Sequence, residues 1–206
     1  MNNINVLIQQ MCPDGMTEYT IEECCSFSDG MHNLPTVHST GQYPILSAQN
    51  IEHNTYNLNT SKYVDFDTYI KENKRTNVQN GSVLLTIVGA IGRSAVVKTN
   101  LEALFQRSVC VLNPDNKIIN SSFLKYLLDS REVQQYMIDH AHGAAQKGLY
   151  LGSVGKIKLL VPPLEIQEKI VNILDAFTEL TTELTTELTT ELTLRRKQYA
   201  YYRNEI

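Results

Sequence analysis

Residues 178–193 read TELTTELTTELTTELT, which is the tetrapeptide TELT four times in tandem. Around this repeat the chain contains neither glycine nor proline from Leu164 to Ile206. A segment of that length without either residue predicts one continuous helix, with Pro163 near its first turn. About 40 helical residues span about 60 Å, which is too long to pack against one small domain. We therefore expect the helix to project and to pair with another helix.

The apolar side chains of this segment form a stripe whose period changes along the helix. A heptad-like seam comes first, and the leucines of the repeat then recur every four residues. Four residues turn a helix by about 400°, so the stripe rotates by about 40° per unit and unwinds a coiled coil locally. Threonine is a poor helix former, so such a helix needs a partner. The alternative is a low-complexity surface helix without a function. The expected dimerisation and spacer residues are Ile170, Ile173, Phe177, Leu180, Leu184, Leu188 and Leu192.

The rest of the chain predicts a mixed globular domain. Short β-rich runs bounded by glycine, asparagine or proline occur at 43–47, 82–88, 95–98, 106–112 and 156–161. Helices are expected over residues 5–11 and over 121–140, the second capped by Ser121 or Ser122, and residues 142–155 are expected to form a glycine-rich loop. Asp65 and Asp67 suggest one face of a strand or turn. The predicted class is α/β (α+β), with a globular domain over 1–162 and a long C-terminal coiled-coil helix over 163–206.

Charge and composition limit the possible functions. The net charge is −4, but residues 165–194 hold seven acids against Lys169 alone, so the remainder of the 206-residue chain is net positive. Basic loops on that remainder could bind phosphates. The four cysteines form no CxxC pair, which favours reduced, buried thiols over a metal site or disulfides. No apolar run has the length of a membrane span, and residues 1–10 lack a signal-peptide pattern, so we expect a cytoplasmic protein without membrane contact.

Motifs for catalysis are absent from the sequence. No phosphate-binding GxxxxGK[ST] or GxGxxG pattern, GxSxG elbow or HExxH metal pair occurs. Asp65 and Asp67 have no catalytic lysine beside them, and Asn113-Pro114-Asp115 is not the Asn-Pro-Pro-aromatic loop of an amino-methyltransferase. The sequence therefore argues against a free-standing nuclease or methyltransferase and predicts no catalytic residue, metal or cofactor in this chain.

Five segments together resemble the specificity subunits of type I restriction–modification systems, in the half-length form with one target-recognition domain. The junction LLVPPLEIQEKI (159–170) and the tail RKQYAYYR (196–203) are the most specific of them. The departures from the family pattern are Ser82 in place of an acid and the inserted Ile166. The other three segments are CPDG (12–15) with Tyr19 and Ile21, GQYPIL (41–46) running into Asn50-Ile51, and GSVLL (81–85) followed by Gly89-x-x-Gly92-Arg93.

The resemblance implies a non-catalytic DNA-binding protein. Its globular domain would grip one half-site of a bipartite target in double-stranded DNA, mainly through the major groove, and its long helix would pair antiparallel with that of a second copy. DNA methyltransferase subunits would carry S-adenosylmethionine, and a restriction/translocase subunit would carry ATP and Mg²⁺. One repeat unit more or less would change the spacer by about 6 Å, close to two base-pair steps. The alternative is a coiled-coil adaptor whose globular head binds protein.

Candidate DNA contacts follow from side-chain chemistry, because the family pattern does not extend to the loops that meet bases. Arg93 and Lys147 rank first, since both lie in glycine-rich loops and can reach phosphate or guanine. For each candidate the alternative is an ordinary exposed polar side chain. The further candidates are Gln146, His142, Ser94, Lys98, Lys71, Lys74, Arg75, His32 and Asn33.

Overall fold

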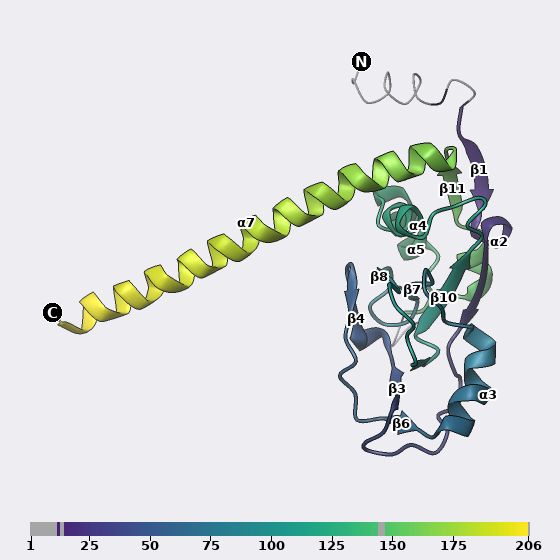
Figure 1. The fold of residues 1–206 in the computed structure, drawn as a ribbon, viewed down its shortest axis with the longest axis horizontal. Coiled ribbons are helices and arrows are strands. Elements are labelled where there is room, and N and C mark those ends of the chain that lie inside the picture. Colours follow the sequence, from purple (N-terminus) through teal and green to yellow (C-terminus); the bar gives the residue numbers. More distant parts are fainter. Residues whose placement is uncertain (1–11, 13–14, 144–146, 206) are drawn as a thin grey trace. The chain divides into compact units, whose positions relative to one another are not determined.

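The computed structural model of the chain describes Cys12, residues 15–143 and residues 147–205. The helix expected over residues 5–11 and the candidate Gln146 lie outside this part of the chain. The chain divides into two compact units, Met1–Gln167 and Glu168–Ile206. The first unit mixes strands with short helices and the second is entirely helical, which confirms the predicted fold class (Figure 1).

A four-stranded antiparallel sheet forms the centre of the first unit (Figure 1). Its strands lie in the order β2 (Cys25–Asp29), β10 (Val109–Pro114), β7 (Val83–Thr86) and β8 (Ser94–Val96). Every residue of β7 is buried, and this accounts for the apolar run in the sequence. The β-rich runs at 82–88, 95–98 and 106–112 thus correspond to shorter strands at shifted boundaries.

Smaller sheets complete the framework of the first unit. β3 (Tyr43–Leu46) pairs antiparallel with β6 (Tyr63–Val64) and parallel with β9 (Leu104–Phe105). β1 (Thr17–Thr20) pairs antiparallel with β11 (Lys158–Val161). β4 (Ile51–Glu52) and β5 (Thr55–Tyr56) form a two-stranded hairpin. Parallel pairing of β3 with β9 joins segments that are distant in the sequence.

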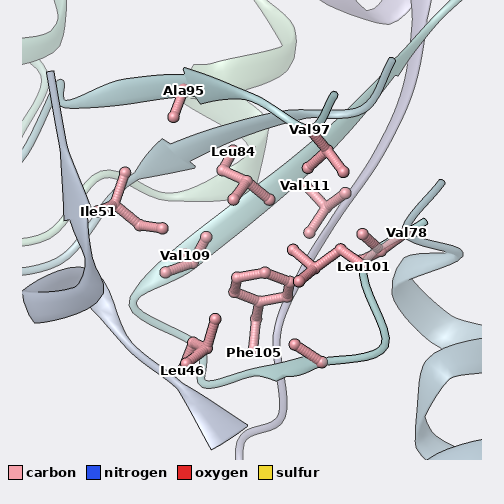
Figure 2. Packing of buried hydrophobic residues seen from close by; sticks show 11 residues of the cluster. Leu46, Ile51, Val78, Leu84, Ala95, Val97, Leu101, Phe105, Val109 and Val111 are labelled. Atoms are coloured by element: carbon pink, nitrogen blue, oxygen red, sulfur yellow. The ribbon is translucent and has the colours of Figure 1, made fainter. Parts of the chain in front are cut away.

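The main hydrophobic core contains side chains from both larger sheets. Phe105 of β9 is fully buried and lies among side chains of β3, β7 and β10 (Figure 2). Burial of one large apolar side chain contributes roughly 1.5–3 kcal/mol, so this cluster is a main source of stability. Its members are Leu46, Ile51, Val78, Leu84, Ala95, Val97, Leu101, Ala103, Phe105, Val109 and Val111.

Two helices differ from those that the sequence suggested. The predicted helix over 121–140 is instead α4 (Ser121–Leu128) followed by α5 (Arg131–Asp139), because Ser130 begins a new helix by accepting from Val133 N. The cap of α4 is Asn120, rather than Ser121 or Ser122, and its Oδ1 accepts from two backbone N–H groups.

Helices also occur where a strand, a turn or a loop was expected. The strand or turn expected at Asp65 and Asp67 is wrong, because Asp65 caps α3 (Phe66–Thr76) by accepting from Thr68 N at 2.8 Å. The segment 142–155, expected as a loop, ends in α6 (Leu151–Gly155). The shortest helices are α2 (Ile21–Cys24) and the 3₁₀ turn η1 (Ala48–Asn50). The four cysteines are free and buried, as expected for reduced thiols.

The long helix is α7, which runs from Leu164 to Glu205. Its leucine stripe is exposed in the chain, with Leu180 61% and Leu192 52% accessible. The threonine hydroxyls of the repeat donate to carbonyl oxygens four residues earlier, at 2.7 to 2.9 Å. These bonds satisfy the hydroxyls within the helix. Among the described residues no helix combines the length and the apolarity that a bilayer crossing needs.

Candidate nucleic-acid interface

The tight turn between β7 and β8 presents Arg93 at one end of the central sheet. Gly89 and Gly92 have φ of +82° and +90°, a conformation that other residues rarely adopt. The Thr86 hydroxyl donates to the Ala90 carbonyl oxygen and accepts from Arg93 N at 2.9 Å. The backbone of the turn is therefore fixed from within, and Arg93 is half-buried beside it.

A second loop is hydrogen-bonded to this turn. Gly89 N donates to the Lys147 carbonyl oxygen at 3.0 Å, and Leu149 N donates to the Ile87 carbonyl oxygen at 2.7 Å. His142 pairs with Gly148 on the same loop. The structure thus brings the two leading candidates, Arg93 and Lys147, onto neighbouring loops although 54 positions separate them in the sequence.

The turn between β9 and β10 lies beside both loops. Val109 N donates to the Gln106 carbonyl oxygen at 2.9 Å and closes the turn. Ile87 N donates to the Ser108 carbonyl oxygen at 2.9 Å, while the Ser108 hydroxyl accepts from Ala48 N at 3.1 Å. Gln106 and Arg107 are therefore held next to the end of β7.

Two hollows open among these loops, and we call their lining the recognition surface. The first, of about 450 Å³, is lined in part by Gln49, Arg93, Gln106 and Arg107. The second, of about 390 Å³, shares Arg107 with the first. The segments involved are 29–32, 47–49, 87–93, 106–108, 142–143 and 148–151.

Asp29 is the one carboxylate among the described residues that line the two hollows, and it is buried. Arg75 donates to both its side chain and its backbone carbonyl, and His32 Nε2 lies 2.6 Å from Oδ2. Arg75 is thus engaged in a structural ion pair, while His32 is anchored at the edge of the second hollow. With its carboxylate neutralised by partners, the recognition surface is cationic and suits a polyanion.

The remaining candidates are dispersed. Ser94 is fully buried and donates to Asp129 Oδ1 at 2.8 Å, so its hydroxyl is out of reach of a macromolecular ligand. Lys98 is exposed beyond the end of β8 that lies away from the recognition surface, since Val97 N bonds to Ser82 O at the start of β7. Lys71 and Lys74 are exposed on α3, and Asn33 is exposed next to His32.

Gln49, Gln106 and Arg107 are among the polar side chains of the recognition surface that sequence reasoning missed. Gln49 belongs to η1, and the other two belong to the turn that precedes β10. The available signal was the short polar interruption QRS (106–108) between two apolar runs, which marks a turn. Nothing local in that turn indicates that it adjoins residues 31, 46 and 87.

A family model described as the type I restriction modification DNA specificity domain matches residues 13–194. The specificity subunit of the type I restriction enzyme EcoBI from Escherichia coli is 34% identical over 98 residues, which are 48% of this chain and 21% of that protein. A putative type I restriction enzyme specificity subunit from Haemophilus influenzae is 40% identical over 127 residues, 61% of this chain and 31% of that protein.

Solved structures show the same fold at low identity. The S subunit of a type I restriction–modification system from M. genitalium has a TM-score of 0.54 at 19% identity, over 82% of this chain and 41% of that one. The HsdS subunit from Thermoanaerobacter tengcongensis has a TM-score of 0.62 at 16% identity, over 88% of this chain and 44% of that one. The chain thus spans less than half the length of these relatives.

Proposed function

The chain belongs to the type I restriction–modification DNA specificity family, and on this premise we propose that its globular unit recognises one half-site of a bipartite target in double-stranded DNA. The observation that carries the proposal is the recognition surface. Arg93, Arg107 and the loop of Lys147 lie together there, and the carboxylate of Asp29 is paired. Cationic side chains neutralise phosphates, while side-chain amides and guanidinium groups can hydrogen-bond to base edges.

Arg93 and Lys147 fit different parts of this task. Arg93 is partly buried, and its Nη1 lies 3.4 Å from the Ile51 carbonyl oxygen. Lys147 is exposed, and its carbonyl oxygen is bonded to Gly89. A lysine ammonium is a compact charge without the planar fork of arginine, which suits contact with a phosphate.

The second part of the proposal is that two copies associate through antiparallel α7 helices. The exposed leucine stripe needs a partner, and the helix is polarised in charge. Acids predominate over 165–191, whereas Arg195, Arg196, Lys197 and Arg203 follow near its end. Antiparallel pairing brings opposite charges together, while parallel pairing brings like charges together. A symmetric dimer would place two identical half-sites around an unread gap.

The third part concerns the catalytic partners. DNA methyltransferase subunits would bind to the specificity chain and supply S-adenosylmethionine, and a restriction/translocase subunit would supply ATP and Mg²⁺. The chain itself would then act as a non-catalytic recognition subunit without a cofactor of its own. This part of the proposal is supported by the membership of the chain in the DNA specificity family and by the lack of a catalytic motif in the sequence.

The test is co-expression with a DNA methyltransferase subunit, followed by purification of the complex and mapping of methylated sites in the host DNA. We expect a bipartite, palindromic motif that is lost when the chain is omitted. Arg93→Ala and Lys147→Ala should each weaken DNA binding and reduce its salt dependence by about one unit of slope. Lys117→Ala is the control, because Lys117 follows the end of β10 opposite to the recognition surface.

The competing function is a coiled-coil adaptor whose globular head binds protein. It predicts no sequence motif in the methylated sites and no effect of the Arg93 and Lys147 substitutions on DNA. A complex that methylates DNA without any bipartite motif would therefore contradict the recognition proposal and favour the adaptor.

A further inference from the structure

We propose that Arg107 is a specificity-determining residue that reads a guanine within each half-site. The inference rests on the proposed DNA-recognition function and assigns one base contact within it. Arg107 belongs to none of the motifs in the sequence, and its position follows from the tertiary structure alone.

Arg107 lies at the middle of the recognition surface. It lines both hollows, with Gln49, Arg93 and Gln106 on one side and His32 and His142 on the other. Val88 is the other residue that the described linings share, and its side chain is aliphatic. A duplex lying across both hollows would therefore meet Arg107 between them.

The guanidinium of Arg107 is available for a ligand. The side chain is exposed, and within the described part of the chain it makes no hydrogen bond or ion pair. By contrast, Arg93 reaches the Ile51 carbonyl oxygen and Arg75 is bonded to Asp29. Arg107 is thus the arginine of the recognition surface whose guanidinium N–H groups have no partner within the described part of the chain.

The backbone that carries Arg107 is held in place. Arg107 N donates to the Met31 carbonyl oxygen at 2.9 Å, and the preceding Gln106 N donates to the Leu46 carbonyl oxygen at 2.8 Å. With the bond from Ile87 to Ser108, three separate segments hold a turn of three residues. A contact made from a fixed backbone loses less entropy on binding and discriminates more sharply between bases.

The surroundings favour a base over a phosphate. The guanidinium fork matches the O6 and N7 acceptors of guanine in the major groove, and this is the commonest specific arginine contact. Gln49 and Gln106 share the first hollow and carry side-chain amides, which also match base edges. This side of the recognition surface therefore offers both donors and acceptors that fit base edges, in addition to positive charge.

Two substitutions separate the possible roles. Arg107→Lys keeps the positive charge but loses the bidentate fork, and Arg107→Ala loses both. Each variant is co-expressed with the methyltransferase subunit, and the methylated motif is mapped beside that of the wild-type complex and of Lys117→Ala. Thermal unfolding of each purified chain tests whether the fold is intact, which we expect because Arg107 is exposed.

The wild-type motif should contain a guanine that both variants cease to require. For Arg107→Lys we expect discrimination at that position to fall by about 5- to 150-fold, with the other positions kept. A uniform loss of binding with unchanged base preference would place Arg107 on a phosphate and overturn the inference, as would a wild-type half-site without guanine. A wild-type complex that shows no bipartite motif would instead refute the proposed function itself.

Discussion

The side-chain amide of Gln134 donates to the carbonyl oxygen of Gly92, with a distance of 2.9 Å between Nε2 and O. The same nitrogen lies 2.7 Å from the Leu128 carbonyl oxygen. Gly92 has φ of +90°, and a Cβ there would lie 2.4 Å from Oε1 of Gln134. The first turn of α5 thus holds the turn that presents Arg93, and a side chain at position 92 would have to displace the Gln134 amide.

Gly92→Ala should destabilise the chain by about 1–3 kcal/mol, because alanine is strained at this φ and displaces the bonded amide. Gln134→Ala should cost about 1 kcal/mol through the lost hydrogen bonds. The double variant removes the collision, so its cost should be smaller than the sum of the two. Urea denaturation measures the free energy of unfolding of the two single variants and of the double variant. Strictly additive costs would show that the two residues are not coupled.

Gln167→Ala tests the junction before the spacer. Gln167 is fully buried; its Oε1 accepts from Asn120 N at 2.8 Å, and its Nε2 donates to the carbonyl oxygens of Ile118 and Pro162. Removal of the amide leaves one buried and two part-buried backbone groups without this partner, so we expect the free energy of unfolding to fall by about 2–4 kcal/mol in urea denaturation. Glu168→Ala, at the exposed neighbouring position, should stay within about 0.5 kcal/mol of wild type. Equal effects of the two substitutions would refute this role.

Ser94→Ala distinguishes a structural hydroxyl from a DNA contact. Ser94 donates to Asp129, whose other carboxylate oxygen lies 2.8 Å from Nζ of the buried Lys125. Loss of the hydrogen bond from Ser94 to Asp129 should lower stability by about 1–2 kcal/mol and leave DNA affinity unchanged. Thermal unfolding and fluorescence anisotropy with the target duplex measure the two effects. Weaker DNA binding at unchanged stability would instead place the Ser94 hydroxyl on the DNA.

The long helix and the central sheet could be predicted because their signals are local. The absence of glycine and proline after Pro163 defines α7, and the run at 82–88 contains β7. α3 was missed because Asp65 and Asp67 alternate with apolar residues, which suggests an extended chain. The bond from Thr68 N to the Asp65 carboxylate makes Asp65 an N-cap instead, and capping outweighs that alternation.

The candidate site was only partly predictable, because burial and partners are set by tertiary contacts. Glycine-rich loops correctly suggested that Arg93 and Lys147 occupy surface turns. Ser94 was selected for its residue type, and its partner Asp129 lies 35 positions away in the sequence. Arg75 is likewise tied to Asp29 across 46 positions. Arg107 was missed for the same reason, since the segments that hold its turn are distant in the chain.

The N-cap of α3 should make stability depend on pH in the acid range. The backbone N–H and the hydroxyl of Thr68 hold the pKa of Asp65 below its ordinary value. A depressed pKa means that the carboxylate stabilises the fold above its unfolded-state pKa of about 3.9, and that this contribution is lost as the pH falls through the folded-state value. Asp65→Ala should thus be less stable than wild type at pH 7, and the difference should become smaller in acid as the carboxylate is protonated.

Asp65→Asn is the matched control for this effect. Asparagine is as good an N-cap as aspartate but does not titrate, so this variant should stay close to wild type at pH 7. Urea midpoints followed by circular dichroism between pH 2 and pH 7 compare the three chains. A difference between wild type and Asp65→Ala that persists unchanged at the lowest pH would contradict the capping explanation.

Deletion of residues 182–185 tests the spacer function of the repeat. The deletion removes one TELT unit and shortens α7 by about 6 Å, so the unread gap of the target should shrink by about two base pairs. The half-sites should be unchanged, since the recognition surface is untouched. Thr182→Ala keeps the length of the helix and should leave the gap as in wild type. Altered half-sites, or an unaltered gap, would refute the spacer role.

The TELT sequence repeats, and its threonine hydroxyls donate to carbonyl oxygens of the same helix. Each TELT unit therefore presents the same outer surface as the unit before it. Successive units are then related by a screw operation that advances about 6 Å and rotates about 40° beyond a full turn. Two base pairs of B-DNA advance about 7 Å and rotate about 70°. A change in repeat number therefore alters angular phase as well as length. If the repeat acts as the proposed spacer, about 30° of torsion per unit would be left for the DNA or the paired helices to absorb, and this torsion would limit how many units can be gained or lost.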